Sequence, residues 1–440
     1  MSLRSVLPWC ALMALTPAVA GAAAPAIEPA LAGRYFREAS QLCHADGGRL
    51  WGKSLCGPIL LVEPGSRRVV ANQPDGEGRL RAAGGVYVGK LPADQAIANT
   101  AVDWAGVHWT EMLWPLKEDA AQRHTIMAHE AFHRVQDELG LAARESDNAH
   151  LDSLDGRYTL QLEWRALDAA LAATTDVARR AHAADALAFR AARYRRFPGA
   201  EKAETAVERN EGLAEYTGVM VGNRTPAAQV AMARWDLAWH PKNDTSFVRS
   251  FAYATGPAYG ILLDRYRRGW RKAIVSGGSP ARMLAGTLKV DMASAPDVGK
   301  LAARYDGPAL LAAERARADA RARQAALFRA QLVTGPVLKL PLEHMKVQFN
   351  PSNLMPLGDA GTVYPTMHVI DDWGSITIDG GALMAPDWRL LTVPAPARGA
   401  EAGELRGKGW TLELAPGWRV VPGGRAGDWA VGRVVQGSGR

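Results

Sequence analysis

The sequence predicts an α+β protein whose middle is helical and whose two ends are rich in strands. Short apolar or β-branched segments separated by Pro, Gly and Asp occupy the chain up to residue 116. From Lys117 the apolar residues instead recur with the period of a helix. Beyond Gly335-Pro336 the short apolar runs return. At 440 residues the chain is long enough for two or three domains with a sizeable core.

The first strand-rich part is expected to hold a short helix and then five strands, at residues 31–42, 58–62, 68–71, 85–88, 97–104 and 107–114. The middle is expected to hold helices at residues 117–139, 157–173, 177–196, 203–220, 226–239, 248–268, 279–284 and 309–332. The break at Phe197-Pro198-Gly199 after two long alanine-rich helices predicts a helical hairpin. Residues 394–403 are expected to form an exposed loop in the last, β-rich part.

The N-terminus has the pattern of a secretory signal peptide. Arg4 precedes an apolar run, residues 6–20, that ends in Ala18-Val19-Ala20. The run is shorter than the roughly 20 residues of a spanning helix, so cleavage after Ala20 or Ala23 is favoured over a membrane anchor, and no later segment is apolar enough to span a bilayer. We therefore expect a periplasmic or secreted protein divided into residues 1–23 (signal peptide), 24–116 (β-rich), 117–333 (helical) and 334–440 (β-rich).

Export to an oxidising compartment determines which cysteines remain in the mature chain and whether they can form a disulfide. Cys10 leaves with the signal peptide, and the remaining Cys43 and Cys56 are expected to form a disulfide in an oxidising compartment. The net charge of +7 comes from arginines scattered along helices, which indicates no nucleic-acid partner.

The segment His129-Glu130-Ala131-Phe132-His133 has the pattern His-Glu-x-x-His inside the helix expected at 117–139. Histidines four residues apart share one helix face and can bind zinc, while the glutamate between them can act as a general base. The apolar stripe of this helix, Ala128, Phe132, Val135 and Leu139, lies on another face.

A catalytic zinc ion needs a third protein ligand. A third histidine six residues after His133 is excluded, because that position is Leu139 and Gln136 stands where that pattern has a glycine. Two glutamates from later helices remain, Glu163 and Glu211.

The segment Asn210-Glu211-Gly212-Leu213-Ala214-Glu215-Tyr216 resembles the segment that carries the third zinc ligand in gluzincin metallopeptidases, and that of bacterial MA-like peptidases with an EGLAEY segment. The resemblance covers this segment, the His-Glu-x-x-His motif and the order of the regions. It implies a zincin-like core, one Zn²⁺ per chain held by His129, His133 and Glu211, and a peptide or protein substrate. The sequence departs from the pattern in spacing, since 77 residues separate His133 from Glu211. The predicted hairpin accounts for this interval, and Glu163 stays open as the alternative ligand.

Further residues near the motifs are candidates for supporting roles. Glu215, one turn after Glu211, is either a partner of a ligating histidine or a solvated acid. Tyr253 and Tyr259 are candidate hydrogen-bond donors toward the oxyanion that forms at the substrate carbonyl, and Tyr253 is preferred. Asn210 and Tyr216 flank the ligand without an assigned role.

These expectations combine into an exported zinc-dependent peptidase in which Glu130 is the general base. Two alternatives stay open: a zinc hydrolase acting on a non-peptide bond, and a non-catalytic envelope protein for binding or assembly. The sequence does not choose between endo- and exopeptidase activity.

Overall fold

The computed structural model describes residues 26–92, 95–142, 146–294, 298–349, 354–396 and 404–433. The chain divides into two compact units, Met1–Leu311 and Ala312–Arg440. The sequence places the corresponding boundary at residue 334, whereas the division falls within a long helix. The predicted signal peptide lies outside the described residues.

The first unit begins with a helix and a six-stranded sheet. Their bounds are α1 (Pro29–Asp46), β1 (Ile59–Val62), β2 (Arg68–Ala71), β3 (Arg81–Ala83), β4 (Val86–Lys90), β5 (Thr100–Trp104) and β6 (Val107–Leu113). The strand order is β3-β4-β2-β1-β6-β5, with β1 and β6 parallel and the other pairs antiparallel. Of the strands expected here, all five are present, and β3 is the one that the sequence reasoning missed.

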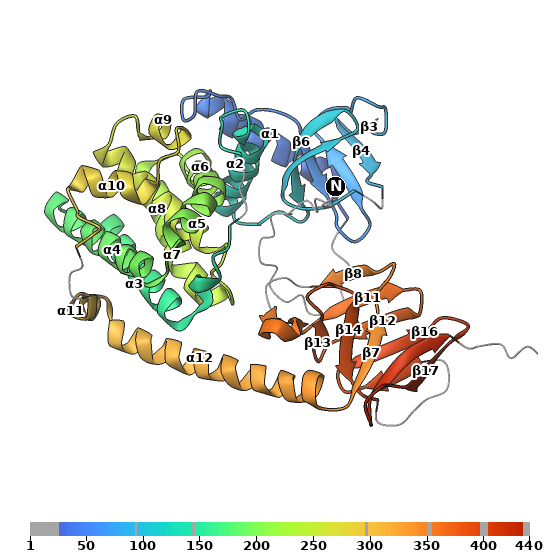
Figure 1. Ribbon diagram of the computed structural model, residues 1–440. Helices are drawn as coiled ribbons and strands as arrows, with labels where there is room; N and C mark the ends of the chain where they lie inside the picture. Colours follow the sequence, from blue (N-terminus) through green and yellow to red (C-terminus); the bar gives the residue numbers. More distant parts are fainter. Residues whose placement is uncertain are drawn as a thin grey trace, which may run out of the picture. The chain divides into compact units, whose positions relative to one another are not determined.

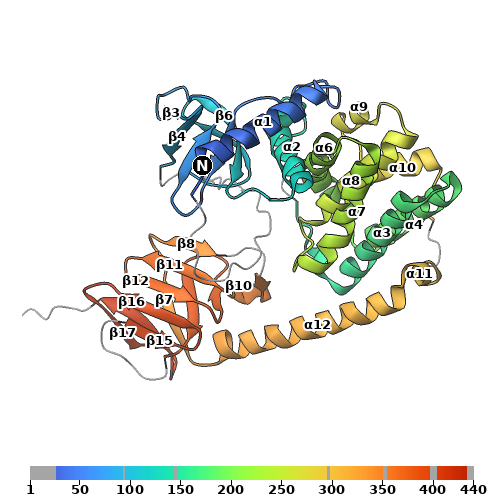
Figure 2. The ribbon, with the colours of Figure 1, turned by 180° about the vertical axis from the view of Figure 1, so that it is seen from behind.

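The rest of the first unit is helical. The bounds are α2 (Ala120–Gln136), η1 (Ala149–Asp152), α3 (Leu154–Ala172), α4 (Asp176–Arg196), α5 (Ala200–Val207), the π-helical turn η2 (Glu208–Gly212), α6 (Leu213–Gly222), α7 (Pro226–Asn243), α8 (Phe251–Tyr266), α9 (Trp270–Val275), α10 (Pro280–Leu288), α11 (Val298–Ala302) and η3 (Ala303–Tyr305). The predicted hairpin is present as α3 and α4, which run side by side (Figure 2). The helix expected at 203–220 is instead α5 and α6 joined by the π turn.

The helix α2 links the sheet to the helical body. One side of α2 packs on β5 and β6 and the other on α6, as Figure 1 shows. Asp119 caps its N-terminus, because the Asp119 side chain accepts a hydrogen bond from the backbone N–H of Gln122. Phe132 and Val135 of its apolar stripe are buried in the core of the helical body. This packing fixes the face of α2 on which the two histidines lie.

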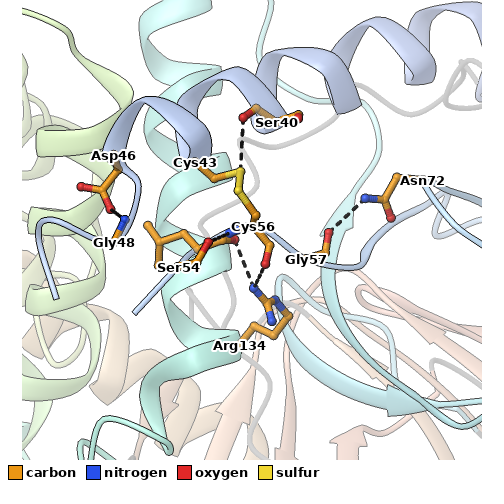
Figure 3. Close-up of a disulfide and its surroundings, with 10 residues drawn as sticks. Ser40, Cys43, Asp46, Gly48, Ser54, Cys56, Gly57, Asn72 and Arg134 are labelled. Carbon is orange, nitrogen blue, oxygen red and sulfur yellow. Dashed lines mark hydrogen bonds between the residues drawn. A yellow bond between two sulfur atoms is a disulfide. The ribbon is translucent and has the colours of Figure 1, made fainter. Parts of the chain in front are cut away.

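A disulfide fastens α1 to the loop before β1. Cys43 of α1 and Cys56 are bonded, as the sequence predicts (Figure 3). The guanidinium of Arg134 in α2 donates to the backbone oxygens of Leu55 and Cys56, at 3.1 and 2.9 Å. The cross-linked loop is thereby held against the helix that carries the motif.

The second unit consists of a long helix followed by two sheets. Its elements are α12 (Gly307–Arg329, which crosses the boundary), the π turn η4 (Ala330–Thr334), β7 (Val337–Pro341), β8 (Lys346–Phe349), β9 (Met355–Pro356), η6 (Gly358–Ala360), β10 (Thr362–Tyr364), β11 (Met367–Asp371), β12 (Gly374–Ile378), β13 (Ala382–Met384), β14 (Leu390–Pro394), β15 (Glu404–Gly407), β16 (Trp410–Leu414), β17 (Trp418–Pro422) and β18 (Trp429–Arg433). The sheets have the orders β17-β18-β7-β14-β13-β10-β9 and β15-β16-β12-β11-β8. Leu340 and Leu391 of the first sheet share one apolar core with Val369 and Leu412 of the second.

Together these units confirm the α+β class with a small N-terminal sheet, a helical body and a β-rich C-terminal region. Among the described residues, no helix combines the length and the apolar character needed to cross a membrane.

Candidate metal centre

The two histidines of the motif meet on one face of α2. His129 and His133 are one helical turn apart, and their Nε2 atoms lie 3.0 Å from each other. Both imidazoles are buried, with side-chain exposures of 1% and 8%. The helix therefore presents two nitrogen ligand atoms toward the same point.

The second nitrogen of each ring is held by a neighbouring side chain. His129 Nδ1 lies 2.6 Å from a carboxylate oxygen of Glu215, and His133 Nδ1 lies 2.7 Å from the amide oxygen of Gln136. The amide oxygen of Gln136 only accepts, and a carboxylate oxygen is an acceptor as well, so these contacts suit a proton on each Nδ1. This arrangement leaves both Nε2 lone pairs free for a metal ion and fixes the ring orientations.

Glu211 supplies a third ligand atom from the π turn. Its Oε2 lies 3.7 Å from His129 Nε2 and 3.6 Å from His133 Nε2. A triangle with sides of 3.0, 3.6 and 3.7 Å has a point about 2.0 Å from each corner, which matches the bond lengths of zinc to nitrogen and oxygen. The donor set of two imidazoles and one carboxylate therefore fits a zinc ion, and these three residues form one of the groups able to hold a metal.

Three side chains hold the Glu211 carboxylate. Tyr253 donates its hydroxyl to Oε2 at 2.6 Å, while Arg249 and the Asn210 amide donate to Oε1 at 3.0 and 3.1 Å. Burial opposes the charge of Glu211, but the hydrogen bonds and charges of the two histidines outweigh it and hold its pKa well below the usual range. Glu211 is thus an ionised carboxylate with a fixed orientation.

The electrostatics of the cluster favour positive charge at the ligand atoms. Burial lowers the pKa of His129, but the charge of Glu130 and the hydrogen bonds to Glu211 and Glu215 raise it well above the usual range. Burial also acts against the charge of His133, whose pKa is nevertheless raised, chiefly by Glu211. Either protons or a cation can meet this demand.

Glu130 is fully enclosed, at 1% exposure, and its Oε2 has no hydrogen-bond partner among the described residues. Burial raises the pKa of this carboxyl, against the opposing charges of His129 and His133. A buried carboxyl group with a raised pKa and one unpaired oxygen, next to two candidate metal ligands, is suited to accept a proton from water.

Tyr253 lies in the site, on α8, and its ring stacks on His129 with centroids 5.4 Å apart. Burial and the charge of Glu211 raise the pKa of its hydroxyl well above the usual range, so Tyr253 stays a proton donor. In this structure it donates to Glu211, and the role toward an oxyanion stays a prediction.

The alternative ligand Glu163 is used elsewhere. Its carboxylate accepts from Arg190 and Arg193 at 2.7 Å each, and from the Tyr259 hydroxyl at 2.8 Å. These partners satisfy Glu163 within a buried ionic network, and Tyr259 belongs to the same network. Tyr216 is also engaged away from the histidines, since it donates to Asp264 at 2.6 Å.

Sequence reasoning missed several supporting residues. In the sequence, Gln136 marks only the position where another zinc-binding pattern has a glycine. Its position three residues after His133 nevertheless places its side chain beside that ring. Arg249 carries no sequence signal, because its approach to Glu211 depends on how α8 and the preceding turn pack. Asp236, buried on α7, has a pKa raised by burial and then by the charge of Glu215.

Two other groups of potential ligands in the described residues do not form comparable sites. Cys43 and Cys56, which lie near His44, are joined in the disulfide. Glu343, His344 and Asp372 are solvent-exposed, and such acidic groups commonly occur without an ion.

No protein-family model, no curated protein and no solved structure matches this chain.

Proposed function

We propose that the chain is an exported, zinc-dependent peptidase of the gluzincin type. The observation that carries the proposal is the convergence of His129 Nε2, His133 Nε2 and Glu211 Oε2 next to the unpaired carboxylate oxygen of Glu130. The disulfide between Cys43 and Cys56 supports an oxidising compartment.

Each residue of the site then has a distinct task. His129, His133 and Glu211 hold one zinc ion, which when bound lowers the pKa of water and polarises a substrate carbonyl. Glu130 takes the proton of the attacking water and passes it to the leaving amine. Glu215 and Gln136 keep the two imidazoles in the orientation that points Nε2 at the ion.

Tyr253 and Arg249 contact different oxygens of Glu211. Arg249 contacts Oε1, and Tyr253 contacts the oxygen that faces the histidines. The Arg249 side chain is 40% exposed, so it is the cation of the site that solvent and a substrate can reach. A carbonyl or carboxylate of the bound peptide is a suitable partner for it.

The test uses the purified full-length chain. We expect about one zinc ion per chain and amide hydrolysis that a chelator abolishes. Glu130→Gln should keep the zinc and lose about 10²–10⁴-fold in kcat/KM, because only the general base is removed. Glu138→Gln serves as the control, since Glu138 lies just beyond the same helix with its side chain 54% exposed.

The outcomes also separate the alternatives. Undiminished hydrolysis by Glu130→Gln contradicts the mechanism. Zinc binding without cleavage of any member of a broad peptide library, together with cleavage of ester or other amide substrates, indicates a non-peptide hydrolase. Zinc binding with no hydrolysis at all favours the binding or assembly protein.

A further inference from the structure

The chain between His133 and Glu211 supplies side chains that contact the turn carrying the third candidate ligand. The antiparallel helices α3 and α4 occupy most of this interval. Glu163 of α3 and Arg190 and Arg193 of α4 form a network of charged groups at 0–1% exposure with two glutamates that follow the hairpin, Glu204 and Glu208. One member of this network, Glu208, is the first residue of the π turn that contains Glu211.

A π turn fixes where Glu211 points. It closes i→i+5 hydrogen bonds and so takes one residue more than an α-helical turn, which rotates the following residues by about 100°. Such turns occur often at functional sites and need stabilising contacts, because the backbone gains little from the conformation itself. The contacts that hold the turn at Glu208–Gly212 therefore set the direction of the ligand.

Arg190 of α4 holds the start of the turn. Its Nη1 and Nη2 donate to the two carboxylate oxygens of Glu208 at 2.9 and 2.6 Å, while its Nε donates to Glu163 at 2.7 Å. This paired geometry fixes both the position and the rotation of the Glu208 side chain. Since Arg190 is itself 0% exposed and bonded on its other edge, it cannot follow Glu208 if the turn shifts.

The other end of the turn rests on α8. A Cβ atom added to Gly256 would lie 2.1 Å from the backbone oxygen of Gly212, so the two backbones are in direct contact. The same helix carries Tyr253, which donates to Glu211. The turn is thus held between an arginine at its beginning and a glycine contact at its end.

We infer that Arg190, acting through Glu208, is a positioning residue for the metal ligand Glu211, and that the α3–α4 hairpin is part of the metal centre. The inference rests on the metal site of the proposed function, though not on peptidase activity. Glu163, the alternative ligand that the sequence leaves open, instead accepts a hydrogen bond from Nε of Arg190 and so holds the guanidinium in place.

Glu204 provides a matched control from the same network. It is 0% exposed and accepts from Arg193 at 2.8 and 2.7 Å, so its replacement disturbs an equally buried ion pair. However, Glu204 lies in α5, before the π turn. Glu208→Gln and Glu204→Gln are therefore similar in chemistry and burial, but only the first changes a side chain of the turn, since Glu204 reaches Glu208 through its backbone oxygen.

The experiment measures metal binding by the full-length chain, with zinc competition titrations and the visible absorption of the Co²⁺-substituted protein. Glu208→Gln should weaken zinc binding by about 10–100-fold and alter the Co²⁺ spectrum, as loss of a supporting contact does at other metal sites. Glu204→Gln should lower the urea midpoint of the metal-free protein while changing zinc affinity less than about 2-fold. Arg190→Lys should resemble Glu208→Gln, because lysine cannot donate to both oxygens in one plane.

Zinc affinity and Co²⁺ spectrum unchanged in Glu208→Gln would overturn the inference. It would equally fail if Glu204→Gln weakened zinc binding as much as Glu208→Gln, because the effect would then follow general stability. A wild-type chain that binds zinc but cleaves no peptide refutes the proposed peptidase and leaves this test intact. If the wild type binds no zinc, both proposals fall.

Discussion

The helical body contains two buried clusters of carboxyl groups, and the two clusters differ in the source of the positive charge that balances them. In the α3–α4 network, Arg190 and Arg193 supply fixed positive charge for three glutamates. Burial lowers the pKa values of both arginines, but the neighbouring carboxylates outweigh burial and raise both pKa values above the usual range. The cations of this cluster are covalent parts of the chain.

The histidine cluster is built from groups whose charge can change. It contains four buried carboxyl groups, those of Glu130, Glu211, Glu215 and Asp236, at 1–5% exposure. Its innermost bases are His129 and His133, and the arginine that reaches it, Arg249, is 40% exposed on its side chain. Positive charge at its centre must come from protons on the imidazoles or from a bound cation.

This difference separates a structural cluster from a candidate site. A buried charge with a permanent partner needs no bound ion to balance it, whereas a cluster that accepts an exchangeable cation couples the fold directly to ligand binding. The comparison implies that variants of the two clusters respond differently when metal is added or removed.

The largest expected effect comes from removing a cation of the network. Arg193→Met leaves buried carboxylates underpaired and should cost about 3–5 kcal/mol of unfolding free energy. The loss should be the same with saturating zinc and with a chelator, as measured by urea denaturation. Arg193→Lys is the milder companion if the methionine variant does not fold.

Glu211→Gln is the counterpart in the histidine cluster. In this variant, zinc should no longer raise the urea midpoint, whereas in the wild type zinc at 1,000 times its dissociation constant adds about 4 kcal/mol. A zinc-dependent cost of Arg193→Met, or a zinc response preserved in Glu211→Gln, would erase the distinction between the clusters.

An intermediate effect is expected at the glycine contact that joins the clusters. Gly256→Ala forces a methyl group against Gly212 and should cost about 1–3 kcal/mol while weakening zinc binding, because α8 and the π turn must separate. Gly286→Ala, in α10, is the matched control, since apart from the nearby backbone of its own helix no described atom lies within 4 Å of the added Cβ. That substitution should stabilise the protein by up to about 1 kcal/mol and leave zinc affinity unchanged. Zinc affinity equal to wild type in a folded Gly256→Ala protein would show that the contact does not position the turn.

The sequence predicted what is encoded locally. The spacing of His129 and His133 determines that they share a helix face, and the disulfide and the α+β class also followed from sequence patterns. The choice between Glu163 and Glu211 could not be made from the sequence without the resemblance, because both lie in helices. What distinguishes them in space is that α4 directs two arginines at Glu163.

The features that sequence reasoning missed depend on contacts between distant elements. The π turn was hidden in a stretch that has the pattern of one continuous helix, because a single extra residue leaves the local composition unchanged. Likewise, nothing near Arg249 in the sequence indicates that it reaches a carboxylate 38 residues earlier. Tertiary packing selects these arrangements.

The clearest signature of fixed pairing is expected from Glu204, in the pH dependence of the unfolding free energy. Burial alone would raise the pKa of this carboxyl, but the charge and hydrogen bonds of Arg193 lower it to about 2, from an ordinary value of 4.5. Because the folded-state pKa lies below the unfolded one, ionised Glu204 stabilises the fold above about pH 4.5 and loses this effect as the pH falls toward 2. Glu204→Gln should therefore flatten the acid slope of the unfolding free energy by at most about 1.4 kcal/mol per pH unit.

Asp176 is the control that separates buried from exposed pairing. Its pKa is also lowered to about 2, first by the hydrogen bond from Arg180, but the group is exposed to solvent. High salt screens exposed pairs and affects buried ones much less. The contribution of Asp176, measured with Asp176→Asn, should shrink in about 1 M salt, while that of Glu204 should persist. If both contributions vanished in salt, the network would be accessible to ions, and its arginines could not be the permanent counter-charges that distinguish it from the histidine cluster.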